Sequence, residues 1–144
     1  MNKPCKRVLL FVLICANLAV IWGNSLMTGD DSGQFSAAVL AFLGRFIPFF
    51  FGELGHTILR KLAHFSEFAC LGLLTGGFRL LRKKADFGIL GFGMAVACVD
   101  ETIQVFVPGR GSSLIDVWID TAGFALGLLI LLTGYTITRK LHRK

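Results

Sequence analysis

The chain has 144 residues, of which 54% are hydrophobic and only 17% charged, and its mean hydropathy is +0.69. Soluble domains are about 25% charged, so this composition excludes an ordinary soluble domain and indicates an integral membrane protein. The net charge of +6 does not indicate a nucleic-acid-binding protein, because the basic residues lie in short clusters at the ends of apolar runs.

The apolar runs predict how often the chain crosses a membrane. Four runs reach, or nearly reach, the roughly 20 helical residues that span a bilayer core. They cover about residues 8–27, 57–78, 87–107 and 114–136. We therefore predict an all-α membrane protein in which residues 1–144 form a single domain with four transmembrane helices.

The clusters of basic residues predict the orientation. With four spans, most of the 15 Lys and Arg residues fall on one side of the membrane. By the positive-inside rule this side is the cytoplasm, so both termini are predicted to be cytoplasmic. The clusters comprise Lys3, Lys6, Arg7, Arg79, Arg82, Lys83, Lys84, Arg139, Lys140, Arg143 and Lys144.

Residues 33–55 are rich in Phe but are interrupted by Arg45 and Pro48. A fifth crossing here would reverse every later span and place the basic cluster at residues 79–84 outside. We therefore interpret this stretch as an outer interfacial or re-entrant segment between the first and second spans.

Several ionisable side chains lie in the outer parts of the predicted spans. Each costs about 2.5–3.5 kcal/mol near mid-span on insertion scales, so these groups are expected to face one another, a base or water. Helical spacing places Arg60, His64 and Glu67 on one face, Glu101 one turn from Gln104, and Asp116 one turn from Asp120. The set comprises His64, Glu67, Asp100, Glu101, Asp116 and Asp120.

Glycines spaced four apart continue two of these faces, as Gly72 and Gly76 in the second span and Gly123 and Gly127 in the fourth. Such faces allow helix backbones to approach closely. The combination predicts an outward-facing polar cavity above a tight glycine seam.

Simpler explanations stay open for individual residues. Asp116 can complete a capping box with Ser113, and Arg60 can act as an interfacial anchor whose charge reaches water. Asp100 and Glu101 can form a loop pair if the third span ends early.

The polar motifs resemble those of the VanZ-like family. Arg-Lys-x-x-His-Phe-x-Glu occupies residues 60–67, Asp-Glu-x-x-Gln-x-Phe-Val-Pro-Gly-Arg occupies residues 100–110, and Ser, Asp and Gly-x-x-x-Gly follow within residues 113–127. The resemblance implies a small protein of the bacterial cytoplasmic membrane associated with the cell envelope. The family's namesake is linked to resistance to the glycopeptide teicoplanin.

Two functions fit these residues. In the first, the cavity binds the anionic headgroup of a membrane lipid or of a lipid-linked cell-envelope precursor, because guanidinium groups and helix N-termini suit phosphate. The expected ligand-binding residues are Arg60, Lys61, Gln104, Arg110, Ser113, Asp116 and Asp120.

The alternative function is a metal-dependent enzyme that acts on a lipid-linked phosphate headgroup. His64, Glu67 and Glu101 would then transfer protons. A divalent cation such as Mg²⁺ or Ca²⁺ would bind carboxylate oxygens, supplied by Asp100, Glu101, Asp116 and Asp120. The chain contains no recognised nucleophile motif. An ion-coupled carrier ranks last, because the inner halves of the spans contain few polar groups.

Overall fold

The computed structural model describes residues 2–43, 53–82 and 88–141, and every regular element in these ranges is an α-helix. The helices are α1 (Lys3–Leu26), α2 (Gly29–Leu43), α3 (Glu53–Arg82), α4 (Gly88–Val105) and α5 (Leu114–Leu141). The prediction of an all-α protein is therefore confirmed for the described part of the chain.

Three of the described helices, α1, α4 and α5, are long and apolar enough to cross a membrane. The longest helix, α3 with 30 residues, is not among them, because its first half carries Arg60, Lys61, His64 and Glu67. Three of the four predicted spans are thus supported by length and composition, and the assignment of α3 as a span stays a prediction.

The segment between the first two predicted spans is helical from Gly29 to Leu43. Thr28 caps this helix, since its Oγ1 accepts the N–H of Asp31 at 3.2 Å and donates to the Asp31 carboxylate at 2.7 Å. Arg45 and Pro48 lie outside the described residues. The interfacial or re-entrant position of residues 33–55 is not confirmed.

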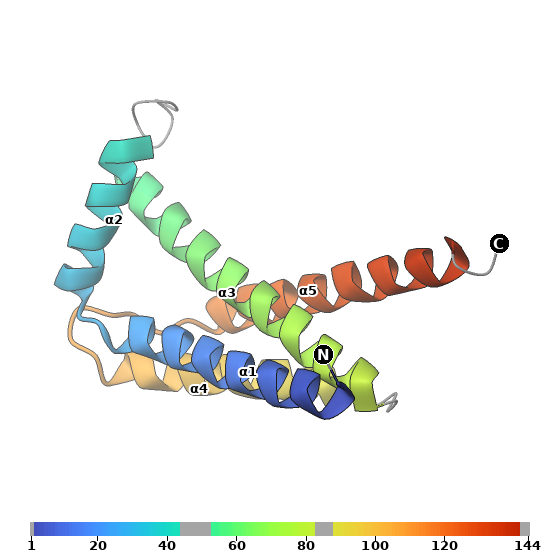
Figure 1. Ribbon diagram of the computed structural model, residues 1–144. Helices are drawn as coiled ribbons and strands as arrows, with labels where there is room; N and C mark the ends of the chain where they lie inside the picture. The colour runs from blue at the N-terminus through green and yellow to red at the C-terminus, as the bar shows by residue number, and fades with distance from the viewer. Residues whose placement is uncertain (1, 44–52, 83–87, 142–144) are drawn as a thin grey trace.

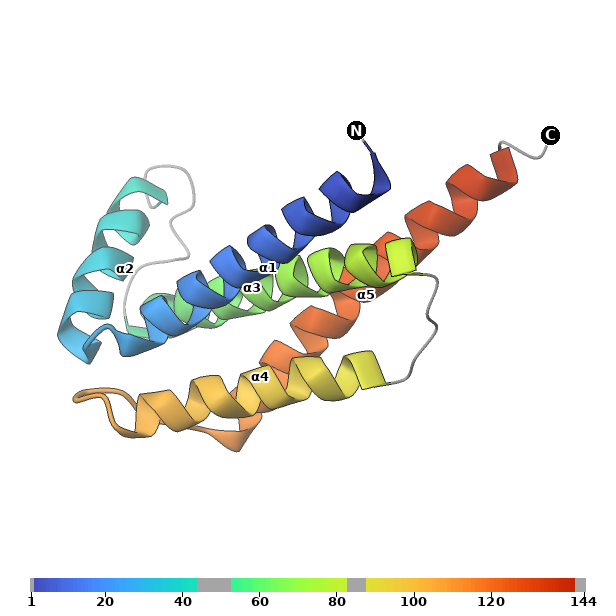
Figure 2. The same cartoon turned by 60° about the horizontal axis from the view of Figure 1, so that its bottom comes forward.

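The bundle has two distinct ends. The start of α1, the end of α3, the start of α4 and the end of α5 lie at one end, which we call the terminal end (Figures 1 and 2). Helix α2 and the connection between α4 and α5 lie at the other, which we call the α2 end. There the backbone N–H of Gly29 donates to the carbonyl of Pro108 at 3.1 Å.

Helices α3 and α5 pack along the predicted glycine seam. A Cβ atom placed on Gly72, Gly123 or Gly127 would lie only 1.9–2.4 Å from a carbonyl oxygen of the facing helix. Gly76 instead faces the side chains of Leu128 and Leu131. The seam therefore brings the two backbones into direct contact near the middle of the bundle.

The apolar core lies beside this seam. Phe124 is fully buried and its ring meets Gly93 and the edge of Phe92, with ring centroids 6.4 Å apart. Many other apolar side chains are exposed on the outer surfaces of α1, α4 and α5, as expected of helices surrounded by lipid. The core cluster comprises Ile21, Phe68, Leu71, Val96, Ala97, Val117, Phe124 and Leu128.

Candidate functional site

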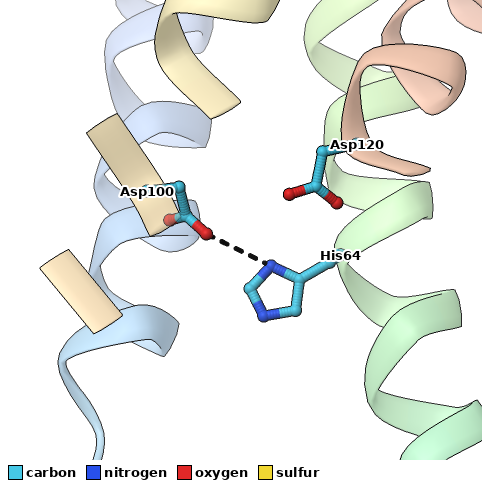
Figure 3. Close-up of side chains that lie close together, drawn as sticks. All are labelled: His64, Asp100 and Asp120. Carbon is cyan, nitrogen blue, oxygen red and sulfur yellow. Dashed lines mark ion pairs between the residues drawn. The ribbon is translucent and has the colours of Figure 1, made fainter. Parts of the chain in front are cut away.

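Three ionisable side chains from three different helices meet inside the bundle (Figure 3). His64 of α3, Asp100 of α4 and Asp120 of α5 each present a potential metal ligand atom within 4.8 Å of the others. The Nδ1 atom of His64 lies 3.6 Å from Oδ2 of Asp100. Asp100 is 0% exposed, Asp120 is only 2% exposed, and Nδ1 of the partly exposed His64 is buried, so we call these three residues the buried triad.

Asp100 is the best satisfied member of the buried triad. Ser25 Oγ donates to its Oδ1 at 2.7 Å, and Gln104 Nε2 donates to its Oδ2 at 3.0 Å. Ser25 and Gln104 are themselves buried. These hydrogen bonds connect α1 to α4 and hold the Asp100 carboxylate in one orientation.

Asp120 has no such support. Its carboxylate makes no hydrogen bond and no ion pair with any residue that the structure describes. Nδ1 of His64 is also buried and has no hydrogen-bond partner within the described ranges. Buried polar groups are nearly always hydrogen-bonded, so we expect these two groups to bind a ligand or a proton.

Glu101 caps the start of α5. Its Oε2 accepts the backbone N–H of Ser113 at 2.7 Å, while Ser113 Oγ accepts the N–H of Ile115 at 3.2 Å. A carboxylate at this position is favoured by the positive end of the helix dipole. Asp116 is therefore not the capping partner of Ser113 and instead forms an ion pair with Lys61.

The loop-pair interpretation of Asp100 and Glu101 is wrong. Both residues lie within α4, which continues to Val105, and both are buried. Gln104 lies one turn further along the same helix, and its side-chain amide hydrogen-bonds both carboxylates.

Arg110 holds the end of α1. Its Nε donates to the carbonyl of Met27 at 3.0 Å, and one terminal nitrogen donates to the carbonyl of Asn24 at 2.6 Å. Burial lowers the pKa of this guanidinium from its ordinary value, yet an arginine stays cationic at neutral pH. The other terminal nitrogen, Nη1, is buried without a hydrogen-bond partner among the described residues.

Glu67 meets Asn24 of α1, whose Nδ2 donates to Oε1 at 2.5 Å. Neither Asn24 nor Ser25 is among the site residues predicted from the sequence. The available signal was the adjacent polar pair that closes an otherwise apolar run at residues 8–27.

Two hollows adjoin the buried triad. The larger, which we call the cleft, measures about 220 Å³, and the smaller, of about 10 Å³, has room for about one water molecule. His64 and Arg60 line both. The remaining cleft residues are Asn24, Met27, Ser32, Val39, Leu59, Ala63, Glu67 and Arg110, and the small hollow is completed by Lys61, Glu101, Gln104, Asp116, Ile119 and Asp120.

Every site residue predicted from the sequence thus lies in one region near the α2 end. The small hollow gathers most of the predicted ligand-binding residues. Ser113 contacts this group through Glu101, and Asp100 does so through Gln104. Arg110 and Glu67 line the adjoining cleft. The functional role of each residue stays a prediction.

The fold and the site define a small helical membrane protein with a buried polar network. A sequence model described as VanZ/LLP1 matches residues 8–136, and the chain therefore belongs to the VanZ/LLP1 family. The VanZ-like assignment from the polar motifs is confirmed. No curated protein and no solved structure matches the chain.

Proposed function

We propose that the protein binds the anionic headgroup of a membrane lipid or of a lipid-linked cell-envelope precursor in the cleft. The supporting observation is that two guanidinium groups line the cleft with N–H groups to spare. Arg60 makes no hydrogen bond or ion pair with the described part of the chain, and Nη1 of Arg110 is buried and unpaired there.

The chemistry of the lining suits such a ligand. A guanidinium presents parallel N–H donors that match two phosphate oxygens. Asn24 and Ser32 add polar groups, while Val39, Leu59 and Ala63 supply an apolar side for the first part of a lipid tail. Lys61 contributes less, because it is already paired with Asp116.

The proposal includes a membrane topology with four spans, cytoplasmic termini and an interfacial α2 on the outer face of a bacterial cytoplasmic membrane. The described basic helix ends, which are the start of α1 and the ends of α3 and α5, lie at the terminal end. Helix α3 is about 45 Å long at 1.5 Å per residue, which exceeds a bilayer core of about 30 Å. Its polar side chains meet polar groups of α1, α4 and α5.

Cysteine labelling tests this topology. In a background without native cysteines, a membrane-impermeant maleimide should label Ser32→Cys in intact cells but should label Arg82→Cys only after permeabilisation. Labelling of Arg82→Cys in intact cells would indicate the opposite topology, with the cleft on the cytoplasmic side.

Lipid binding can be measured on protein in nanodiscs or neutral detergent in the presence of a chelator. Phosphatidylglycerol should bind and raise the melting temperature, whereas phosphatidylcholine should do so weakly. Arg60→Gln should weaken binding about tenfold, because a hydrogen bond to a charged group contributes about 1.5–3 kcal/mol.

The matched control is Arg82→Gln, which removes the same charge from the opposite end of the same helix. If both variants weaken lipid binding equally, binding depends on the overall charge of the protein, and a specific site in the cleft is contradicted. The resemblance to the VanZ-like family also suggests a role for this protein in teicoplanin resistance, which has its own test. Expression of the wild type, but not of Arg60→Gln, should lower the teicoplanin susceptibility of a sensitive bacterium.

The alternative, a metal-dependent enzyme acting on a lipid-linked phosphate, is favoured by the buried carboxylates of Asp100 and Asp120, which lie beside His64 of the cleft. His64, Glu67 and Glu101 would transfer protons. A bound divalent cation would polarise the phosphate. The test is release of inorganic phosphate from a polyprenyl pyrophosphate with and without divalent cations, and no release under either condition would exclude this substrate.

A further inference from the structure

We infer that the buried triad of His64, Asp100 and Asp120 is a binding site for a divalent transition-metal ion, of which Zn²⁺ fits best. This site differs from the four carboxylates expected from the sequence, because it includes an imidazole and excludes Glu101 and Asp116. The inference does not depend on headgroup binding, since none of its supporting contacts involves the guanidinium groups of the cleft.

The geometry is close to that of a bound ion. One ligand atom from each residue lies within 4.8 Å of the other two. Ligands that surround a tetrahedral Zn²⁺ at about 2.0–2.2 Å are about 3.3–3.6 Å apart. Bringing the most distant ligand atoms to this spacing requires them to approach by at most about 1.5 Å, which side-chain rotations supply.

The ligand atoms are also available. Asp120 is 2% exposed, and Figure 3 shows its carboxylate directed toward His64 and Asp100. It has no hydrogen bond or ion pair within the described ranges, and neither does Nδ1 of His64 have a hydrogen bond there. Glu101 and Asp116, in contrast, already bind the Ser113 N–H and Lys61.

The charges around the site favour a dication. Five carboxylates and three strong bases lie in or beside the two hollows, so when all of them are ionised the carboxylates outnumber the bases by two. Burying an unpaired carboxylate away from water is costly, and one divalent ion would neutralise this excess. The carboxylates are Glu67, Asp100, Glu101, Asp116 and Asp120, and the bases are Arg60, Lys61 and Arg110.

The surroundings of Asp100 resemble those of a metal ligand. Carboxylates that bind metals are usually hydrogen-bonded by neighbouring groups that fix their orientation. Ser25 and Gln104 provide two such donors, at 2.7 and 3.0 Å, and both are buried.

The donor set selects the class of metal. Mg²⁺ and Ca²⁺ prefer oxygen ligands, whereas imidazole nitrogen suits Zn²⁺ and related transition metals. One imidazole and two carboxylates leave a position free for water or a ligand, as in catalytic zinc sites. Because His64 also lines the cleft, an ion held by this residue would lie next to the proposed headgroup.

The experiment measures metal on the full chain in detergent without added lipid. The protein is stripped with a chelator, dialysed against micromolar Zn²⁺ and analysed by mass spectrometry for metal per chain. We expect about one Zn²⁺ per chain, reduced at least tenfold in His64→Gln and in Asp120→Asn. Asp30→Asn, which removes an exposed carboxylate of α2, should retain the full amount.

Three results would overturn the inference. They are no zinc above the detergent blank, full retention of zinc in Asp120→Asn, and loss of zinc in a Glu101→Gln, Asp116→Asn double variant but not in His64→Gln. If the triad variants do not fold, the zinc site is tested on the wild-type protein alone. Pulsed EPR of Cu²⁺-loaded protein must show imidazole nitrogen coupling, and its absence refutes the site.

The two proposals fail independently. Lipid binding is measured with a chelator present, and zinc binding is measured without lipid. If the protein binds phosphatidylglycerol but not zinc, the zinc site is refuted and the headgroup function is not. If it binds zinc but not phosphatidylglycerol, the headgroup function is refuted and the zinc site is not.

Discussion

The contact between α3 and α5 at Gly127 allows a quantitative test of the fold. A Cβ atom on Gly127 would lie 1.9 Å from the carbonyl oxygen of Ala69, whereas ordinary contacts begin at 3.4 Å. Replacing Gly127 with alanine therefore requires the two helices to separate by about 1.5 Å at this level. The obstructing atom belongs to the backbone of a helix, so no side-chain rotation relieves the clash.

The expected loss of stability follows from this displacement. Overpacking of a well-packed interface costs about 1–3 kcal/mol, sometimes more, and the higher helix propensity of alanine returns up to about 1 kcal/mol. We expect Gly127→Ala to destabilise the protein by about 2 kcal/mol. At about 2–4 °C per kcal/mol for a chain of this size, the melting temperature should fall by roughly 4–8 °C.

The assay is thermal unfolding in detergent, compared with Gly134→Ala on the same helix. A Cβ atom on Gly134 would meet no other atom within 4 Å, so the control should be neutral or slightly stabilising. Because the seam sets the spacing of His64 and Asp120, Gly127→Ala should also weaken zinc binding. Equal melting temperatures for the two variants would refute the close approach of α3 and α5.

Three further predictions concern individual polar contacts, each measured by thermal unfolding. Arg110→Ala should cost about 2 kcal/mol, because it removes two charge-assisted hydrogen bonds to the last carbonyls of α1, and Arg110→Lys should restore only part of the loss. Lys61→Ala should cost no more than about 1 kcal/mol, since its pair with Asp116 is partly exposed. A double-mutant cycle with Asp116→Asn that shows no coupling energy would contradict the ion pair. Ser25→Ala should cost about 1.5–3 kcal/mol, because it removes a buried donor to the Asp100 carboxylate, and it should weaken zinc binding about 10–100-fold.

The sequence was sufficient to predict which side chains face inward. Ionisable groups cannot face lipid alone, so Arg60, His64 and Glu67 had to lie on a shared inner face of their helix. The spacing of Gly72, Gly123 and Gly127 likewise predicted the close approach that the structure shows between α3 and α5. Both inferences depend only on helical periodicity and on the cost of exposing polar groups to lipid.

The partner of each polar group could not be predicted in this way. Glu101 rather than Asp116 caps Ser113, and Arg110 binds carbonyls of α1 rather than a carboxylate. These choices depend on the rotation and relative height of neighbouring helices, which are set by packing between distant residues. Ser25 illustrates the same limit, because its contact with Asp100 exists only where α1 lies beside α4.

The distribution of these contacts has a consequence for how the protein is made. Within the hairpin of α4 and α5, Glu101 already binds Ser113, but Asp116 gains its partner only from α3 and Asp100 gains Ser25 only from α1. A nascent chain that releases these helices singly would expose carboxylates to lipid at a cost of up to about 2.5–3.5 kcal/mol each. Biogenesis is therefore expected to retain the helices at the insertion machinery until the bundle closes, and an incompletely assembled chain would display charges that membrane quality-control proteases can recognise.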